Sequence, residues 1–466
     1  PKDRFCRPSE LYPEYLFKNM GISDEKNDVY EMIRNMFIEL ELDKDNLGTE
    51  KWNPLRGYIK RGQTVLIKPN LVTDKNGAEK NRRKSMECLI THPSVVKCIL
   101  DYVLIALDGT GEVIVGDAPI QDCDFKRLKR VSGYQALEEF YKQNFSECFM
   151  IKDFRKIVLT EKRGKKIQSE NKDMEFSTQI VNLSKQSYFY GKNYEKTLRI
   201  TNYDAKDTNQ HHYRGVQEYC LNRACLAADV IISIPKPKTH RLAGYTGALK
   251  NFVGINARKE YLPHHRKGER KRGGDEYPVR DSVKRFSSQL DDWKNRAYKK
   301  NYEFAASFIT NINTLIMKRH RDQTRYGMWY GNDTIWRTIL DLNRIINYCD
   351  NEGNIRDTRQ RKILYLGDMI VCGEKEGPLS PSYKKIGGIL FADNAVAFDL
   401  CLVKLMGYDY LKIPTLKNAM RDKMLYNGES VFLYSNKPEY CGGINNKIKH
   451  FDFEPTSGWR GHIEEI

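Results

Sequence analysis

The chain has 466 residues, which is enough to bury a large core, and its 40% hydrophobic and 11% aromatic content is typical of a globular protein rather than a disordered one. No apolar run approaches the roughly 18 residues of a membrane-spanning helix, and the odd number of cysteines, with no CxxC pair, argues against a disulfide framework and a Cys-ligated metal site. The net charge of +17 favours anionic partners, and the sequence shows no signal-peptide pattern, so we expect a cytoplasmic protein without membrane attachment.

The first 150 residues alternate between helical and strand patterns. Strands are predicted where β-branched residues run together, and helices where apolar residues recur at helical spacing. A strand, a helix and a second strand at this spacing form a βαβ unit, whose strands pair in parallel. In chain order the patterns predict a helix over 27–42, a strand over 63–71, a helix that Ser94 caps and that ends at Leu107, a strand over 112–117 and a helix over 132–143.

The middle of the chain carries two insertions around a core strand. Short alternating segments separated by basic or polar turns predict an antiparallel β insertion over 151–215, followed by a helix over 216–226. Residues 230–234 are β-branched and too few for a helix, so they predict a buried strand. Residues 266–330 are rich in charge and include a helical pattern over 304–316, so we predict a second insertion that is basic and helical.

The last part of the chain returns to α/β patterns. In order, they predict a helix over 334–348, a strand over 363–368, an acidic loop over 372–381, a strand over 386–392 and a helix over 395–406. The sequence therefore predicts an α/β fold with a mainly parallel sheet flanked by helices, an antiparallel β insertion and a basic helical insertion. Its segments are an N-terminal α/β half (1–150), the β-rich insertion (151–215), a core strand and site loop (216–265), the basic insertion (266–330), a C-terminal α/β half (331–411) and a C-terminal extension (412–466).

The stretch after the strand at 230–234 gathers cationic and proton-exchanging side chains. The chain breaks out of the strand at Pro235 and Pro237, and a glycine-rich turn follows. Ligands of open α/β sheets bind just beyond the carboxyl ends of the strands, so we interpret this stretch as a shaped site rather than as a set of solvated lysines. Its candidate residues are Lys236, Lys238, His240, Lys250, Asn251, His264 and His265.

Polar side chains also stand at the ends of other predicted strands and in the loops that follow. Asn70 and Asp117 have an alternative role as loop or turn caps, and we leave both interpretations open. Asp399 lies inside an apolar helix, where a carboxylate needs a partner, and Lys236, Lys238 or a group of backbone amides would serve. The strand-end and loop candidates are Lys68, Asn70, Asp117, Glu374, Glu376 and Asp393.

Several motifs taken together resemble the domain-of-unknown-function 362 family: PKPKTH…TGALKN…G, the upstream VLIKPNLV, and the downstream GEKEGPLSP and ADNAVAFD. This resemblance implies an α/β fold and no settled reaction. A more distant similarity is to the nickel-pincer lactate racemase family. There His240 would match the first His, Lys250 the lysine that anchors the pincer cofactor, and His264 or His265 the metal-binding His. Thr246-Gly247-Ala248 departs from that family's Ser-Gly-Gly run, and no Pro-Gly follows the lysine.

The sequence has no P-loop, GxGxxG, GxSxG or HExxH motif, which excludes the common kinase, dinucleotide, hydrolase and zincin patterns. Our first hypothesis is an enzyme on a small anionic substrate. In it, His240 and His264 or His265 exchange protons, as in a racemase or epimerase, and Lys250 is catalytic as a cofactor anchor or an anion ligand. The residues expected to bind the substrate are Lys68, Asn70, Lys236, Lys238, Asn251 and Glu374.

Other chemistries stay open at this point. A divalent metal held by His240, His265, Asp117 and Asp393 would supply Lewis-acid chemistry at the same site. A binding protein whose basic stretch at 258–273 holds nucleic acid or an acidic partner is the alternative class of function. A scaffold protein with a degenerate site is a third possible class of function.

Overall fold

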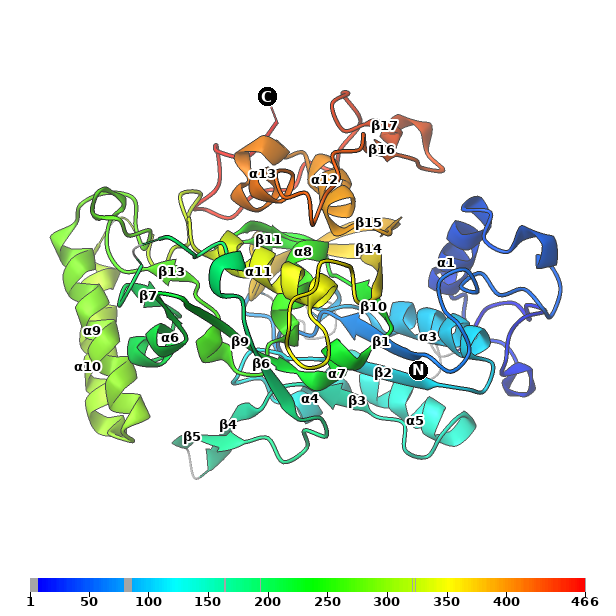
Figure 1. Cartoon of the computed structure of the whole chain (residues 1–466), viewed down its shortest axis with the longest axis horizontal. Helices are drawn as coiled ribbons and strands as arrows, with labels where there is room; N and C mark the ends of the chain where they lie inside the picture. The colour runs from blue at the N-terminus through cyan, green and yellow to red at the C-terminus, as the bar shows by residue number, and fades with distance from the viewer. Residues whose placement is uncertain are drawn as a thin grey trace.

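A computed structural model describes residues 7–78, 86–162, 165–192, 194–320, 322 and 324–465 of the chain. Its centre is an eight-stranded sheet in the order β12-β11-β14-β10-β1-β2-β3, with β15 paired to β14 (Figure 1). The strands are β1 (Thr64–Pro69), β2 (Glu112–Asp117), β3 (Ile151–Asp153), β10 (Val230–Ile234), β11 (Lys238–His240), β12 (Gly244–Thr246), β14 (Lys362–Glu376) and β15 (Ser380–Ala392).

The central strands of this sheet run parallel to one another. β14, β10, β1, β2 and β3 pair in parallel with their neighbours, and only β12 and β15 add antiparallel pairs. Apolar residues on both faces of β1 and β10 are fully buried, as a parallel sheet covered by helices requires. The predicted α/β fold with a mainly parallel sheet is therefore confirmed.

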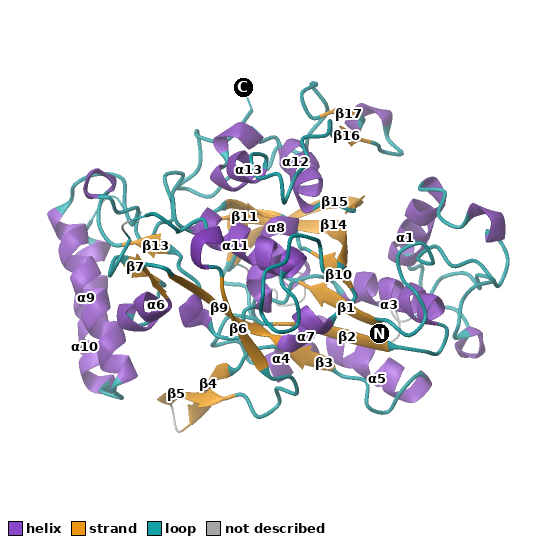
Figure 2. Cartoon of the chain, in the orientation of Figure 1, coloured by secondary structure: helices purple, strands orange, loops and turns teal. Residues whose placement is uncertain are grey.

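Helices cover the sheet on both faces (Figure 2). Because successive strand residues point to opposite faces, Val65 and Ile67 pack into one hydrophobic core while Leu66 packs into the other. The first core is covered by α1 (Asp28–Glu39), α3 (Pro93–Leu107), α4 (Phe125–Ser132) and α5 (Tyr134–Asn144). The second is covered by α7 (Arg223–Ala227), α8 (Ala248–Asn251), α11 (Ile335–Tyr348), α12 (Ala395–Met406) and α13 (Pro414–Ala419).

The insertions form smaller units outside the sheet. The predicted antiparallel β insertion is present and its strands lie in three small sheets, but β3, which the sequence predicts to belong to it, joins the central sheet in parallel. Its elements are β4 (Ile157–Lys162), β5 (Lys165–Glu170), β6 (Thr178–Asn182), β7 (Leu198–Arg199), α6 (Ala205–His211), β8 (His212–Tyr213) and β9 (Val216–Asn222). The second insertion holds β13 (His265–Arg266) and the helices α9 (Ser282–Lys299) and α10 (Glu303–Lys318), and the C-terminal extension holds β16 (Phe432–Leu433) and β17 (Gly442–Gly443). In the described part of the chain, no helix is long and apolar enough to cross a membrane.

Three local predictions are wrong. Residues 216–226 form strand β9 and the short helix α7 rather than one helix, because β9 pairs with β6 and β8 and this pairing overrides the apolar spacing. Helix α3 is capped by the His92 side chain, with Pro93 at its first position, so Ser94 lies inside the helix. The acidic segment 372–381 is not a free loop, since β14 continues to Glu376 and forms a hairpin with β15.

Candidate functional site

Lys68 and Asp117 form a buried ion pair at the carboxyl ends of β1 and β2. The Lys68 Nζ lies 2.7 Å from Asp117 Oδ1, and both residues are at most 2% exposed. Asp117 also accepts the backbone N–H groups of Leu71 (2.6 Å) and Ala118 (2.9 Å). A side chain at Gly254 would collide with this pair, because its Cβ would lie 2.1 Å from Asp117 Oδ1.

Two amide side chains connect this pair to the loop after β10. Asn251 accepts from Lys68 Nζ (3.4 Å) and from Asn70 Nδ2 (3.2 Å), and its own amide donates to the Ser233 hydroxyl (2.9 Å). Lys238 donates to Asn70 Oδ1 (2.8 Å) and to the backbone carbonyl of Leu89. The structure thus brings together predicted residues from β1, β2, β11 and α8.

Five lysines gather at this edge of the sheet, and we call them the lysine cluster: Lys68, Lys236, Lys238, Lys250 and Lys259. Lys236 pairs with Asp368 at 2.7 Å, and Lys259 donates to the carbonyls of Ala118 (2.8 Å) and Asn256 (3.3 Å). Within the described ranges, Asp117 and Asp368 are the carboxylates that form ion pairs with the cluster. The cluster therefore carries more positive than negative groups.

Lys250 differs from the other four lysines. Its amine forms no hydrogen bond or ion pair with any described residue, although the side chain is half-buried. Burial lowers the pKa of Lys250 to about 8, and burial together with the charge of Lys236 lowers the pKa of Lys238 to about 7. The structure therefore holds a poorly solvated amine that is free to take an anion or to react.

The short helix α8 places Lys250, and Asp399 of α12 holds α8 in position. The Asp399 carboxylate accepts the N–H groups of Ala248 (2.6 Å) and Leu249 (3.0 Å) and the Tyr245 hydroxyl (2.7 Å). A Cβ at Gly247 would lie 2.1 Å from Asp399 Oδ1, so only glycine fits there. Of the predicted alternatives, the group of backbone amides is thus the partner of Asp399. The prediction that Lys236 or Lys238 pairs with it is wrong.

His240 and His264 lie near the cluster with opposite tautomers. His240 Nδ1 accepts the N–H groups of Leu242 (3.1 Å) and Ala243 (3.3 Å), so the ring proton of the neutral imidazole sits on Nε2. His264 Nδ1 lies 2.6 Å from the carbonyl of Leu262 and must donate to it, so its Nε2 carries a free lone pair. Among the described residues, neither Nε2 has a hydrogen-bond partner.

The electrostatic surroundings keep both rings neutral. Burial lowers the pKa of His240 well below its ordinary value, and Lys250 and His264 lower it further. Burial lowers the pKa of His264 to about 4, with a smaller contribution from Lys250. Each ring therefore feels the charge of Lys250, and the pair offers one N–H donor and one bare nitrogen.

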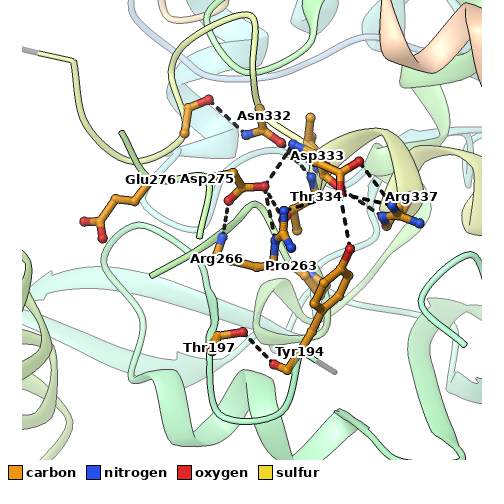
Figure 3. A network of polar contacts seen from close by, with 12 residues as sticks. Tyr194, Thr197, Pro263, Arg266, Asp275, Glu276, Asn332, Asp333, Thr334 and Arg337 are labelled. Carbon is orange, nitrogen blue, oxygen red and sulfur yellow. Dashed lines mark hydrogen bonds and ion pairs between the residues drawn. The ribbon is translucent and has the colours of Figure 1, made fainter. Parts of the chain in front are cut away.

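A polar network fixes the segment that carries His264 to the start of α11 (Figure 3). Thr338 donates to the carbonyl of Pro263 (2.7 Å), and Asn332 donates to the carbonyl of His264 (3.0 Å). Farther along the segment, buried Asp275 accepts the Thr334 hydroxyl (2.6 Å) and pairs with Arg266. Asn332 and Thr338 thereby hold the backbone at His264 against the start of α11.

Several predicted site residues lie elsewhere. The ring of His265, at the start of β13, contacts Tyr326. Among the described residues its Nδ1 is buried without a hydrogen-bond partner, and burial lowers its pKa to about 3. Glu374 binds Lys384 (2.9 Å), and Glu376 binds Arg241 (2.9 Å), so neither acidic residue joins the cluster.

Asp393 lies at the opposite edge of the sheet. It lines a hollow of about 610 Å³ with residues that precede β1, β10 and β14, such as Gln63, Asp229 and Arg361. This hollow is therefore at the amino ends of the strands, away from the lysine cluster. Within the described ranges no three His, Cys, Asp or Glu side chains gather as a metal site, so the structure does not bring His240, His265, Asp117 and Asp393 together as ligands.

Ion pairs take up much of the charge in the basic stretch 258–273. Arg258 pairs with Glu260, Lys267 with Asp292 at 2.6 Å, and Arg272 with Glu269 at 3.1 Å. Three adjacent basic side chains of this stretch, Arg270, Lys271 and Arg272, are exposed.

Comparison with known proteins shows to which family the chain belongs. A profile described as "Domain of unknown function (DUF362)" matches residues 65–186 and 150–404, well over half of the chain. The chain belongs to this family. No curated protein matches. A crystal structure of a Thermotoga maritima protein from a structural genomics consortium is similar at 12% identity and a TM-score of 0.30, over 78% of this chain; the chain spans 55% of that protein's length.

The family match covers the whole site. It begins at β1, just before Lys68, and continues past Asp399 in α12. Sequence reasoning missed Lys259 and Asp368 as members of this site. Asp368 follows the same strand-end pattern as Asp117, so the signal was present, whereas nothing in the sequence around Lys259 distinguishes it from a solvated lysine.

Proposed function

We propose that this chain is an enzyme that binds a small anionic substrate at the carboxyl ends of the central sheet. The observation that carries the proposal is the lysine cluster, in which the amine of Lys250 has no partner among the residues that the structure describes. A half-buried ammonium group that no carboxylate neutralises is stabilised by an anionic ligand. A carboxylate or phosphate group bound to Lys250, with Lys238 nearby, would supply that missing charge.

The two histidines suggest proton transfer next to the anionic group. The bare Nε2 of His264 is suited to accept a proton from a substrate carbon, and the Nε2–H of His240 is suited to donate a hydrogen bond to the oxygen on which negative charge then develops. Binding of an anion would raise the pKa of both rings, which makes His264 a better base in the complex than in the free protein. This assignment is of the isomerase type, with a racemase or epimerase as one form of it.

A pincer-type cofactor on Lys250 is compatible with part of this geometry. The free amine of Lys250 could carry a covalent group, and His264 offers an open Nε2, while His265, whose ring contacts Tyr326, does not fit. Such a cofactor would supply racemase-like chemistry. The roles of Lys238, His240 and His264 in binding and proton transfer do not depend on it.

Binding of a probe anion tests the proposal. In calorimetric titrations with inorganic phosphate and with malonate, we expect Lys250→Met to weaken binding about ten- to hundredfold, since a hydrogen bond to a charged group is worth roughly 1.5–3 kcal/mol. Wild-type affinity should fall as the pH rises through about 8, because Lys250 then loses its proton. The exposed Lys300→Met is the matched control. Equal affinity of wild type and Lys250→Met would contradict the proposal.

A further inference from the structure

The second insertion ends in a helical hairpin of α9 and α10 that lies at one edge of the molecule (Figures 1 and 2). Helix α10 presents an apolar row to solvent: Phe304 is 88% exposed, Phe308 59% and Leu315 54%. Their spacing of four and seven residues places them on one face of the helix. The opposite face, with Ala306 and Met317, is the one that is buried.

This helix also lacks the charges that a solvated face carries. None of the fourteen residues between Glu303 and Lys318 is charged. A surface helix of a globular protein normally has charged residues on its outer face, whereas the centre of a protein interface is depleted of charge and rich in aromatic side chains. The outer face of α10 therefore has the composition of a covered surface.

We propose that α10 packs antiparallel against α10 of a second copy of this chain. Glu303 stands at the start of the helix and Lys318 at its end, so a two-fold arrangement brings each Glu303 beside Lys318 of the other copy. The same arrangement sets Phe304 of one copy opposite Leu315 of the other, so the apolar row of each helix is covered by that of its partner. The charges at the two ends are thus complementary to those of a second, reversed α10.

Other occupants fit this face less well. A helix that lies on an anionic membrane carries Lys or Arg along its polar face, and α10 has a single lysine at its very end. A charged protein partner would find no charge in the middle of the helix to recognise. Self-association uses the features that the helix has: an uncharged apolar centre and one charge of each sign at its ends.

Sedimentation velocity of the full chain over a wide dilution series tests the pairing. We expect a reversible dimer, and we expect Phe308→Glu to raise its dissociation constant about tenfold or more, because the variant places a charge in the centre of the interface. Leu411→Glu is the matched control, since Leu411 is similarly exposed (56%) on a different part of the surface. Circular dichroism would establish that both variants keep the fold.

A charge exchange tests the antiparallel register. Glu303→Lys and Lys318→Glu should each weaken the dimer, and the double variant should restore it, because each interface pairs one residue of each kind. A chain that stays monomeric at every concentration would overturn the proposal. So would a dimer that Phe308→Glu leaves intact, or a monomer whose binding to anionic phospholipid vesicles depends on Phe308.

Discussion

Replacement of Asp117 by alanine is expected to lower the free energy of unfolding by about 3–5 kcal/mol, because it leaves the charge of Lys68 buried without a carboxylate to neutralise it. Lys68 is fully buried, and its amine has no exposed surface to which it could turn. The variant also removes the acceptor of the Leu71 and Ala118 N–H groups. A loss of this size is a large part of the roughly 5–15 kcal/mol that typically stabilises a folded protein.

Equilibrium unfolding in urea measures this loss, and two variants control it. Glu439→Ala removes the exposed ion pair with Lys449, which should change stability by about 1 kcal/mol or less. Lys68→Met combined with Asp117→Leu removes both charges and should recover part of the loss, since only the two N–H groups then lack an acceptor. A loss for Asp117→Ala no larger than that for Glu439→Ala would contradict the description of a buried, mutually dependent pair.

Lys250 is expected to be the first lysine to react with an anionic aldehyde such as pyridoxal phosphate. Burial lowers its pKa to about 8 from an ordinary value of 10.5. At about pH 7.5 the neutral fraction of such an amine is about one quarter, against about one in a thousand for an ordinary lysine. The amine forms an imine with loss of water, borohydride reduces the imine, and peptide mass analysis locates the product.

Lys259 provides an internal comparison for this reaction. Burial lowers its pKa to about 7, but its amine donates to two backbone carbonyls, whereas Lys250 has no partner among the described residues. We therefore expect Lys250 to be modified before Lys259, and excess phosphate to protect it. Modification of exposed lysines before Lys250, or equal labelling in the presence of phosphate, would show that the amine is not available as the structure implies.

The layout of the fold could be predicted from the sequence because the main strands are short, β-branched and bounded by breaks. Residues 63–71, 112–117 and 230–234 each gave such a pattern, and all three form neighbouring parallel strands. Carboxyl ends of parallel strands meet at one edge of a sheet, which is why Lys68 and Asp117 could be expected close together. The same reasoning failed for 216–226, where pairing with distant strands decides the structure.

The details of the site could not be predicted from the sequence. The partner of each lysine depends on distances between strands, so nothing local distinguishes Lys236, which pairs with Asp368, from Lys250, which has no partner in the described part of the chain. The surroundings of a histidine also depend on the fold: His264 feels the charges of Lys250 and Lys259, whereas the ring of adjacent His265 contacts Tyr326. Asp393 follows a strand as Asp117 does, but β15 runs antiparallel to β14, so Asp393 lies at the opposite edge of the sheet.

The most direct test of the proposed site is to locate a bound anion in crystals of the native protein soaked in tungstate, whose heavy atom gives an anomalous signal. We expect a peak within hydrogen-bonding distance of the Lys250 amine, on the side where His240 and His264 lie, and the loss of this peak in Lys250→Met crystals. Peaks found only at exposed lysines, or a peak at the carboxyl ends of the sheet that survives Lys250→Met, would contradict it.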